Sequence, residues 1–186
     1  MNHRSFAGAL IFIGGVQFVI GILLAEFLYP GYSASLNYIS DLGVQQPSSF
    51  IFNASVTILS ILVLICSYFI RREFNSSFVP ILFGLSGAGA IGVGLFPETA
   101  GIIHEIVSFM AFLFGGLSAI AASKLVKAPF TYISVLMGIT SLAALILFMS
   151  EIYLGLGPGG MERLIVYPVL LWIIGFGGNL MSPQQA

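Results

Sequence analysis

The chain has 186 residues, of which 58% are hydrophobic and only 7% are charged. A soluble domain carries roughly 25% charged residues, and a soluble core could not remove so much apolar surface from water. Because the net charge is −1 and the basic residues are scattered, we expect no nucleic-acid partner, and no protein partner can be identified. Cys66 is the only cysteine, which excludes a disulfide within the chain and a cysteine metal cluster.

Long apolar segments predict an all-α protein, a bundle of six transmembrane helices. A helix needs about 20 apolar residues to cross a hydrocarbon core roughly 30 Å thick. Segments of about that length account for most of the chain, so residues 1–186 are expected to form a single six-helix transmembrane domain. The expected spans are residues 6–28, 48–70, 78–95, 102–122, 130–154 and 161–180.

Charged residues divide between the two ends of these spans. Short loops rich in Lys and Arg stay in the cytoplasm during insertion, so we expect a multi-pass protein of the cell membrane with both termini cytoplasmic. The opposite end then forms an acid-rich layer at the outer face. The basic end contains Arg4, Arg71, Arg72, Lys124 and Lys127. The acidic end contains Glu26, Asp41, Glu98, Glu105, Glu151 and Glu162.

The loop after the first span contains the most distinctive stretch, residues 37–43. Asp41 is expected to accept backbone N–H bonds in a turn or short helix, and Gly43 to adopt a left-handed conformation. Asn, Ser and Asp are ordinary turn formers, so a purely structural interpretation is open. The functional interpretation makes Ser40 and Asp41 part of a polar site that reaches into the membrane.

Two further pairs of ionisable residues begin spans. His104 and Glu105 open the fourth span, where an ionisable group near membrane depth indicates a functional site. A hydrogen bond from His104 to a loop carbonyl is the structural alternative. His104 also shares one helical face with Ser108, four residues later.

Glu162 and Arg163 open the sixth span, after a glycine-rich turn. Arg163 is the one basic residue of the acidic layer, so we expect it to pair with an acid there. The structural interpretation is an ion pair that locks the hairpin of the fifth and sixth spans. The functional interpretation is a clamp for a carboxylate or a lipid phosphate.

These ionisable and polar residues exclude some kinds of chemistry and allow others. Two histidines on opposite sides of the membrane exclude a three-histidine zinc site. No cofactor is predicted, but Asp41 and His104 with a glutamate allow an open zinc or calcium site. A catalytic alternative uses Ser40 as nucleophile, His104 as base and a carboxylate such as Asp41 to orient the base.

The chain resembles a prokaryotic membrane family catalogued as domain of unknown function 998. The resemblance rests on residues 38–43, on residues 96–98 followed by His104, and on Glu162 and Arg163 at the start of the last span. It spans nearly the whole chain and implies a shared six-span fold with an outer-face site. It implies no established reaction.

A second resemblance rests on residues 38–43 followed by Pro47, Phe50 and Asn53. This pattern is similar to the Ile-Ser-Asp-x-Gly loop of eukaryotic Frag/DRAM/Sfk-type proteins. Those proteins also have about six spans and a histidine near the start of the fourth, which His104 would match. The resemblance implies an association with the handling of lipids or lipid anchors.

These features predict a membrane protein whose outer-leaflet polar site binds, or modifies, a lipid or other amphiphile, with membrane lipids as partners. We expect Asp41, His104 and Arg163 to converge on a cavity above the first, second, fourth and sixth spans. The alternatives are an intramembrane hydrolase that uses Ser40, Asp41 and His104 or a bound metal, and a small transporter or membrane scaffold. The candidate ligand-binding residues are Asn37, Asp41, Glu98, His104, Glu105, Glu162 and Arg163.

Overall fold

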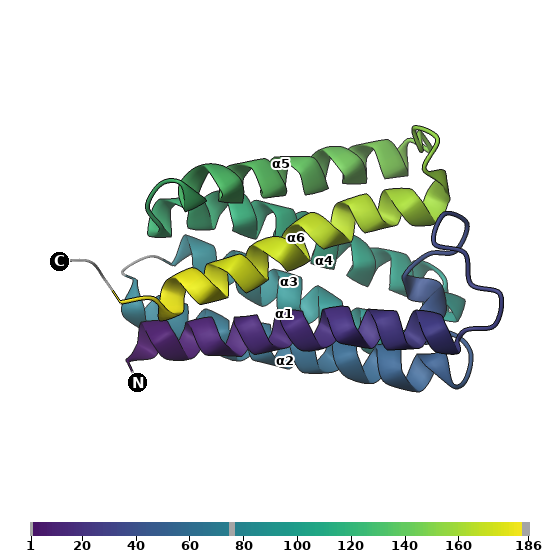
Figure 1. Cartoon of the computed structure of the whole chain (residues 1–186), viewed down its shortest axis with the longest axis horizontal. Coiled ribbons are helices and arrows are strands. Elements are labelled where there is room, and N and C mark those ends of the chain that lie inside the picture. Colours follow the sequence, from purple (N-terminus) through teal and green to yellow (C-terminus); the bar gives the residue numbers. More distant parts are fainter. Residues whose placement is uncertain (1, 75–76, 184–186) are drawn as a thin grey trace.

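Six long α-helices run roughly parallel to one axis and are connected end to end (Figure 1). The structure is a computed structural model that describes residues 2–74 and 77–183. Over these residues each long helix is apolar and long enough to cross a membrane, so the predicted all-α six-span bundle is confirmed. The helices are α1 (His3–Leu28), α2 (Ser48–Glu73), α3 (Phe78–Leu95), α4 (Ile102–Ala122), α5 (Phe130–Met149) and α6 (Gly157–Met181). Short 3-10 helices η1 (Ser40–Gly43), η2 (Glu98–Ala100) and η3 (Ser123–Leu125) lie in the connections.

The observed boundaries differ most from the expected spans around the last connection. Helix α5 ends at Met149, five residues before the expected position 154, and α6 begins at Gly157, four residues before the expected position 161. Pro158 occupies the first turn of α6, where its missing N–H costs no helical hydrogen bond. The glycine-rich segment therefore forms the start of α6 and not only a connecting turn.

Helix neighbours follow from short connections and from small residues at the contacts. Helix α1 packs against α2 and α6, α3 lies between α2 and α4, and α5 covers α4 and α6. At the crossing of α1 and α6, a Cβ atom on Gly8 would lie 2.6 Å from the carbonyl oxygen of Gly177. Helices in a bilayer associate by such close backbone contact, because lipid provides little hydrophobic drive between them.

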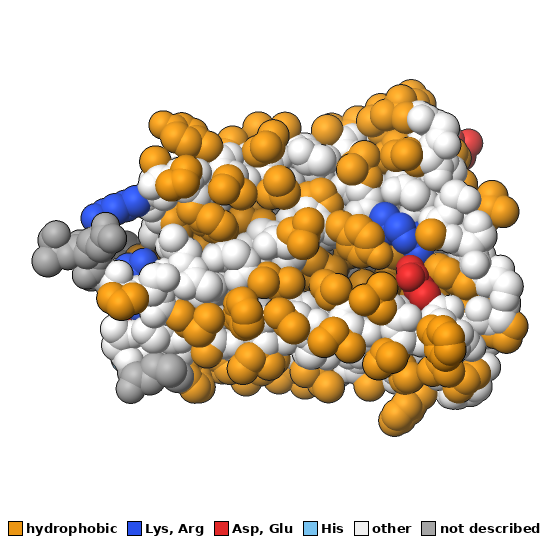
Figure 2. Space-filling model, viewed as in Figure 1, with side chains coloured by type: hydrophobic (Ala, Val, Ile, Leu, Met, Phe, Trp, Pro, Cys, Tyr) orange, Lys and Arg blue, Asp and Glu red, His pale blue; other side chains and the backbone are white. Residues whose placement is uncertain are grey.

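The charges lie at the two ends of this bundle. Lys and Arg side chains gather at the end where the two termini lie (Figures 1 and 2). Near the opposite end an acidic and a basic side chain lie side by side on the face shown in Figure 2. This opposite end is formed by the last turn of α1, by η1 and η2, by the first turn of α4 and by the first two turns of α6. These segments carry most of the acids.

Candidate functional site

Arg163 holds the long loop between α1 and α2 against the bundle. Its guanidinium donates to the backbone oxygens of Ala34 (2.7 Å) and Asn37 (3.2 Å). It also donates to the Glu26 carboxylate (2.7 Å) and to the Tyr32 hydroxyl (2.6 Å), and only 11% of its side chain is exposed. The predicted acidic partner is thus confirmed as Glu26. The pair joins α6 to α1, however, and does not lock the hairpin of α5 and α6.

The first turn of α6 makes direct backbone contact with the same loop. The N–H of Gly159 donates to the carbonyl oxygen of Ser35 (3.0 Å). A Cβ atom on Gly159 would overlap the carbonyl oxygen of Asn37. Gly157 adopts φ +76°, a backbone conformation that glycine adopts at little cost. These glycines explain why α6 can begin so close to the loop.

Short helix η1 is fixed by two carboxylates from different parts of the chain. The N–H of Ile39 donates to Glu162 of α6, which is 5% exposed. The N–H of Tyr38 donates to Asp41 (2.9 Å), and so does the side-chain amide of Asn37 (3.1 Å). Asp41 therefore accepts a backbone N–H bond, as the sequence predicts. Both carboxylates thus accept from backbone N–H groups that come just before η1.

Gly43 ends η1 without the left-handed conformation expected from the sequence, so that expectation is wrong. The glycine instead allows a close approach to α2. A Cβ atom there would lie 2.7 Å from the side-chain oxygen of Asn53 on α2. The Asn53 amide also donates to the Gly43 carbonyl oxygen (3.1 Å), so this end of the loop is joined to α2.

His104 is buried and connects α4 to the end of α3. Its Nδ1 lies 2.7 Å from the carbonyl oxygen of Phe96, and its Nε2 lies 3.1 Å from the Ser108 hydroxyl. A carbonyl oxygen only accepts, so Nδ1 carries a proton, and in the neutral ring Nε2 accepts the hydroxyl proton. The structure thus shows the bond to a loop carbonyl. It also shows that Ser108 is the hydroxyl partner of the imidazole.

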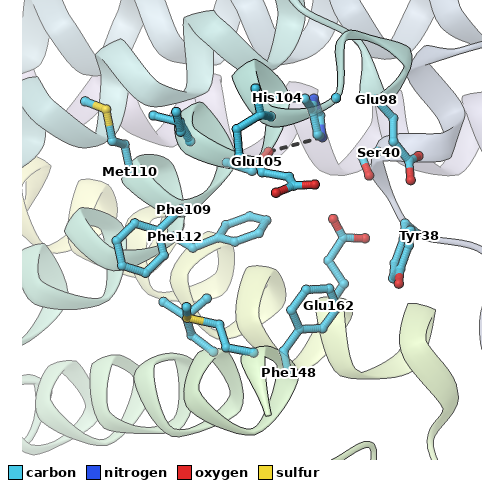
Figure 3. Close-up of a pocket in the computed structure, with 16 residues that line it drawn as sticks. Tyr38, Ser40, Glu98, His104, Glu105, Phe109, Met110, Phe112, Phe148 and Glu162 are labelled. Carbon is cyan, nitrogen blue, oxygen red and sulfur yellow. Dashed lines mark hydrogen bonds between the residues drawn. The ribbon is translucent and has the colours of Figure 1, made fainter. Parts of the chain in front are cut away.

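A cavity of about 540 Å³ lies between α4, α5, α6 and the two short helices η1 and η2 (Figure 3). This volume falls within the range of about 300–1,000 Å³ that is typical of small-molecule sites. The cavity was expected above the first, second, fourth and sixth spans. The long helices that line it are instead α4, α5 and α6. The polar lining consists of Tyr38, Ser40, Glu98, His104, Glu105, Ser108 and Glu162. The apolar lining includes Ile102, Ile106, Phe109, Met110, Phe112, Leu145, Phe148 and Met149.

The candidate residues from the sequence separate into two groups. Those that line the cavity are Ser40, Glu98, His104, Glu105 and Glu162. Asn37, Asp41 and Arg163 are not among the described lining residues, because their side chains hold the loop. The expected convergence of Asp41, His104 and Arg163 on one cavity is therefore not observed.

Glu98 connects the loop to the cavity. Burial, and next a side-chain hydrogen bond to the Asp41 carboxylate, raise the pKa of Glu98 from 4.5 to about 8. Negative charge on Glu162 contributes in the same direction. Near neutral pH the Glu98 carboxyl is therefore mostly protonated and can donate to Asp41. Its Oε2 atom is buried and has no hydrogen-bond partner among the described residues.

Two parts of the cavity carried little signal in the sequence. Ser108 was detectable as the residue one turn after His104, although its hydrogen bond to the ring was not. The rings of Tyr38 and Phe148 pack edge to face with centroids 5.7 Å apart. Phe148 was not identified as a candidate, because the sequence of α5 has no clear division into a polar and an apolar face.

The arrangement gives limited support to catalysis. Ser108 and His104 have the contact of a nucleophile and its base, but attack on an acyl group would create an oxyanion. Three carboxyl groups line the same cavity, and they would oppose that negative charge. Over the described residues, no group of three His, Cys, Asp or Glu side chains is placed to hold a metal ion, so the geometry gives the metal alternative no support.

Six apolar helices and a cavity with one polar wall define a multi-pass membrane protein with a candidate binding site at one end of the bundle. The chain belongs to the family described as "Protein of unknown function (DUF998)", whose model matches residues 12–178. The first resemblance is thereby confirmed. No curated protein and no solved structure matches the chain, and the similarity to Frag/DRAM/Sfk-type proteins stays a prediction.

Replacement of Arg163 by Met is expected to lower the free energy of unfolding by on the order of 3 kcal/mol, because it leaves a partly buried carboxylate and two carbonyl oxygens without their donor. Thermal unfolding in detergent micelles measures the change. Arg72→Met is the matched control, since Arg72 is exposed and lies in the last turn of α2, at the opposite end of the bundle from Arg163. Equal effects of the two substitutions would show that the loop does not depend on Arg163.

Replacement of Glu98 by Gln is expected to stabilise the protein only at high pH. The folded-state pKa of about 8 exceeds the ordinary value of 4.5, so the stability that Glu98 contributes is full below about pH 4.5 and is lost as the pH rises through about 8. The amide mimics the protonated acid. The variant should therefore unfold at the wild-type temperature near about pH 5 and at a higher temperature near about pH 9.

Glu73→Gln is the control for this pH series, because Glu73 is exposed at the opposite end of the bundle. Its unfolding temperature should follow that of the wild type throughout. A constant difference between Glu98→Gln and the wild type at every pH would contradict the raised pKa.

Proposed function

We propose that this protein binds a lipid or other single-chain amphiphile in the cavity between α4, α5 and α6. The observation that carries the proposal is the division of the cavity wall into a polar and an apolar part. Buried Ser40, His104 and Glu162 lie on the polar part, close to the end of the bundle. Such a wall matches a molecule that has a polar head and a hydrocarbon tail.

The mouth of the cavity supports the same function. Ile106, Phe109 and Met149 belong to the lining and are also among the exposed large apolar side chains, with Met149 65% exposed. They lie on α4 and α5, two helices that are apolar enough to face lipid. A tail whose head occupies the polar part can therefore extend between these helices into the hydrocarbon region.

A second, smaller cavity lies next to the polar part of the first cavity. This second cavity of about 110 Å³ shares Ser40, Ser108, Phe112 and Glu162 with the first, and its other lining residues are almost all apolar. It extends toward the centre of the bundle between α2, α3 and α6. The head group therefore has an apolar wall on its bilayer side as well as along α4 and α5.

This binding function predicts where a reactive tail will crosslink. Dodecyl amphiphiles that carry a diazirine at the tail end and different head groups are added to the protein in nanodiscs. After illumination, peptide mass spectrometry locates the crosslinked residues. At least one probe should crosslink mainly to peptides of α4 and α5 at the mouth. Uniform labelling of exposed residues around the bundle, including Leu23 and Phe27 on α1, would contradict a specific site.

Leu145→Trp supplies the matched variant for this experiment, because Leu145 is 5% exposed and lines the cavity. The larger ring should fill the space and reduce crosslinking to α4 and α5. Ile106→Trp, at the exposed mouth, is a second variant for the case that Leu145→Trp does not fold. Leu171→Trp, on a lipid-exposed face of α6, should leave the labelling unchanged.

We further propose that the cavity lies at the outer face of the cell membrane and that both termini lie in the cytoplasm. Support comes from the basic residues, which are retained on the cytoplasmic side during insertion. They gather at the end of the bundle where both termini lie (Figure 2).

Cysteine labelling on intact cells tests this orientation. Leu36→Cys in the loop between α1 and α2 should react with a membrane-impermeant maleimide, whereas Lys127→Cys at the other end should react only after permeabilisation. Both positions are exposed, and the native Cys66 is fully buried. The reverse labelling pattern would place the cavity on the cytoplasmic side.

A further inference from the structure

Three carboxyl groups face the cavity, and no Lys or Arg is among the described residues that line it. They are Glu98 on η2, Glu105 on α4 and Glu162 on α6. The carboxylates of Glu105 and Glu162 point toward each other across the space (Figure 3). Like charges that face each other in a partly buried space repel strongly, because little water is present to screen them.

The basic residue nearest in sequence makes its hydrogen bonds to other groups. Arg163 follows Glu162 directly, but its guanidinium is bound to Glu26, to Tyr32 and to loop carbonyls. The His104 ring also has both nitrogens occupied, by the Phe96 carbonyl and the Ser108 hydroxyl. The protein thus leaves the cavity without a positive group of its own.

One observation besides the number of acids indicates a ligand. Glu162 is 5% exposed and its carboxylate is directed into the cavity, where Figure 3 shows open space in front of it. Glu162 already accepts from the Ile39 N–H, and a cation in the cavity would give its carboxylate a charged partner as well.

The aromatic side chains around the carboxyl groups add a further preference. Tyr38, Phe109, Phe112 and Phe148 line the same space, and Tyr38 and Phe148 form one corner of it. A cation held against aromatic faces gains roughly 0.5–2 kcal/mol, and quaternary ammonium groups are recognised by such surfaces. An anionic head would be repelled by the carboxylates and would find no Lys or Arg among the described lining residues.

On this basis, and resting on the proposed amphiphile-binding function, we infer that the cavity selects amphiphiles whose polar end is a positively charged amine or trimethylammonium group. The ammonium lies between Glu105 and Glu162 against the rings of Tyr38 and Phe148. The tail leaves along Phe109 and Met149. A free cationic amphiphile and the ammonium of a zwitterionic lipid share this chemistry.

Binding of a cation also favours the ionised form of Glu98. The groups that face Glu98 are Asp41 and Tyr38 from the loop, Glu162 from α6, and His104 and Glu105 from α4. Because the Glu98 pKa is about 8 without ligand, a bound ammonium should release a proton near neutral pH. Affinity for the cation should therefore rise with pH up to about 8 and then level off.

The test uses matched dodecyl ligands that compete with the tail-diazirine probe for the cavity in neutral nanodiscs. The ligands are dodecyltrimethylammonium, dodecylphosphocholine, dodecyl maltoside and dodecanoate. The trimethylammonium ligand should bind at least about tenfold more tightly than the maltoside or the carboxylate, which corresponds to about 1.4 kcal/mol. Equally tight binding of phosphocholine would identify a zwitterionic lipid as the source of the ammonium, and weak binding would identify a free cationic amphiphile.

Variants separate this inference from the proposed function. Glu105→Gln should weaken binding of the trimethylammonium ligand severalfold more than binding of the maltoside. Glu162→Gln should show the same difference, and its amide oxygen can still accept from the Ile39 N–H. Glu151→Gln, an exposed acid outside the cavity lining, is the control. If all four head groups compete equally, selectivity is overturned and amphiphile binding stands. If none of the ligands competes and no probe labels the cavity, both proposals fail.

Discussion

Two consecutive side chains of α6 organise the polar end of this protein. Neighbouring residues on a helix point in directions about 100° apart, so Arg163 and Glu162 reach different surroundings. Arg163 turns toward α1 and holds the loop through Glu26, Tyr32 and backbone carbonyls. Glu162 turns inward and holds the start of η1. The ion pair to Glu26 keeps the loop in place, and the carboxylate of Glu162 consequently forms part of a cavity wall.

This division determines the electrostatics of the site. A buried guanidinium needs several acceptors to offset the loss of hydration, and Arg163 finds them on the α1 side of the bundle. The guanidinium therefore makes its hydrogen bonds outside the cavity. The carboxyl groups of Glu98, Glu105 and Glu162 line the cavity without a Lys or Arg among the described lining residues. The same contacts that stabilise the loop therefore give the cavity an excess of negative charge. The proposed preference for a cationic head group rests on this excess of carboxyl groups.

The sequence was sufficient for the spans, for the charge difference between the two ends, and for most polar residues of the cavity. These features depend on composition and on local spacing, as with His104 and Ser108 one turn apart. The direction of Arg163 could not be predicted, because Glu26 and the loop carbonyls come together only in the folded chain. Phe148 lies in α5, whose sequence has no polar and apolar faces, so the pattern does not show which side chains face the cavity. The glycines before Glu162 looked like a turn because their contacts with residues 35 and 37 are long-range.

His104 shows how an ionisable residue can shape a site without supplying its charge. Its Nδ1 proton is bound by the carbonyl oxygen at the end of α3, and its Nε2 is bound to Ser108, so the ring joins α3 and α4 at the cavity wall. The wall then presents a fixed surface, and the proton that can be exchanged lies on Glu98, next to Asp41. A ligand cation that replaces this proton leaves the total charge of the filled site unchanged. Under the proposed cation binding, ligand charge and proton release would therefore be coupled through Glu98.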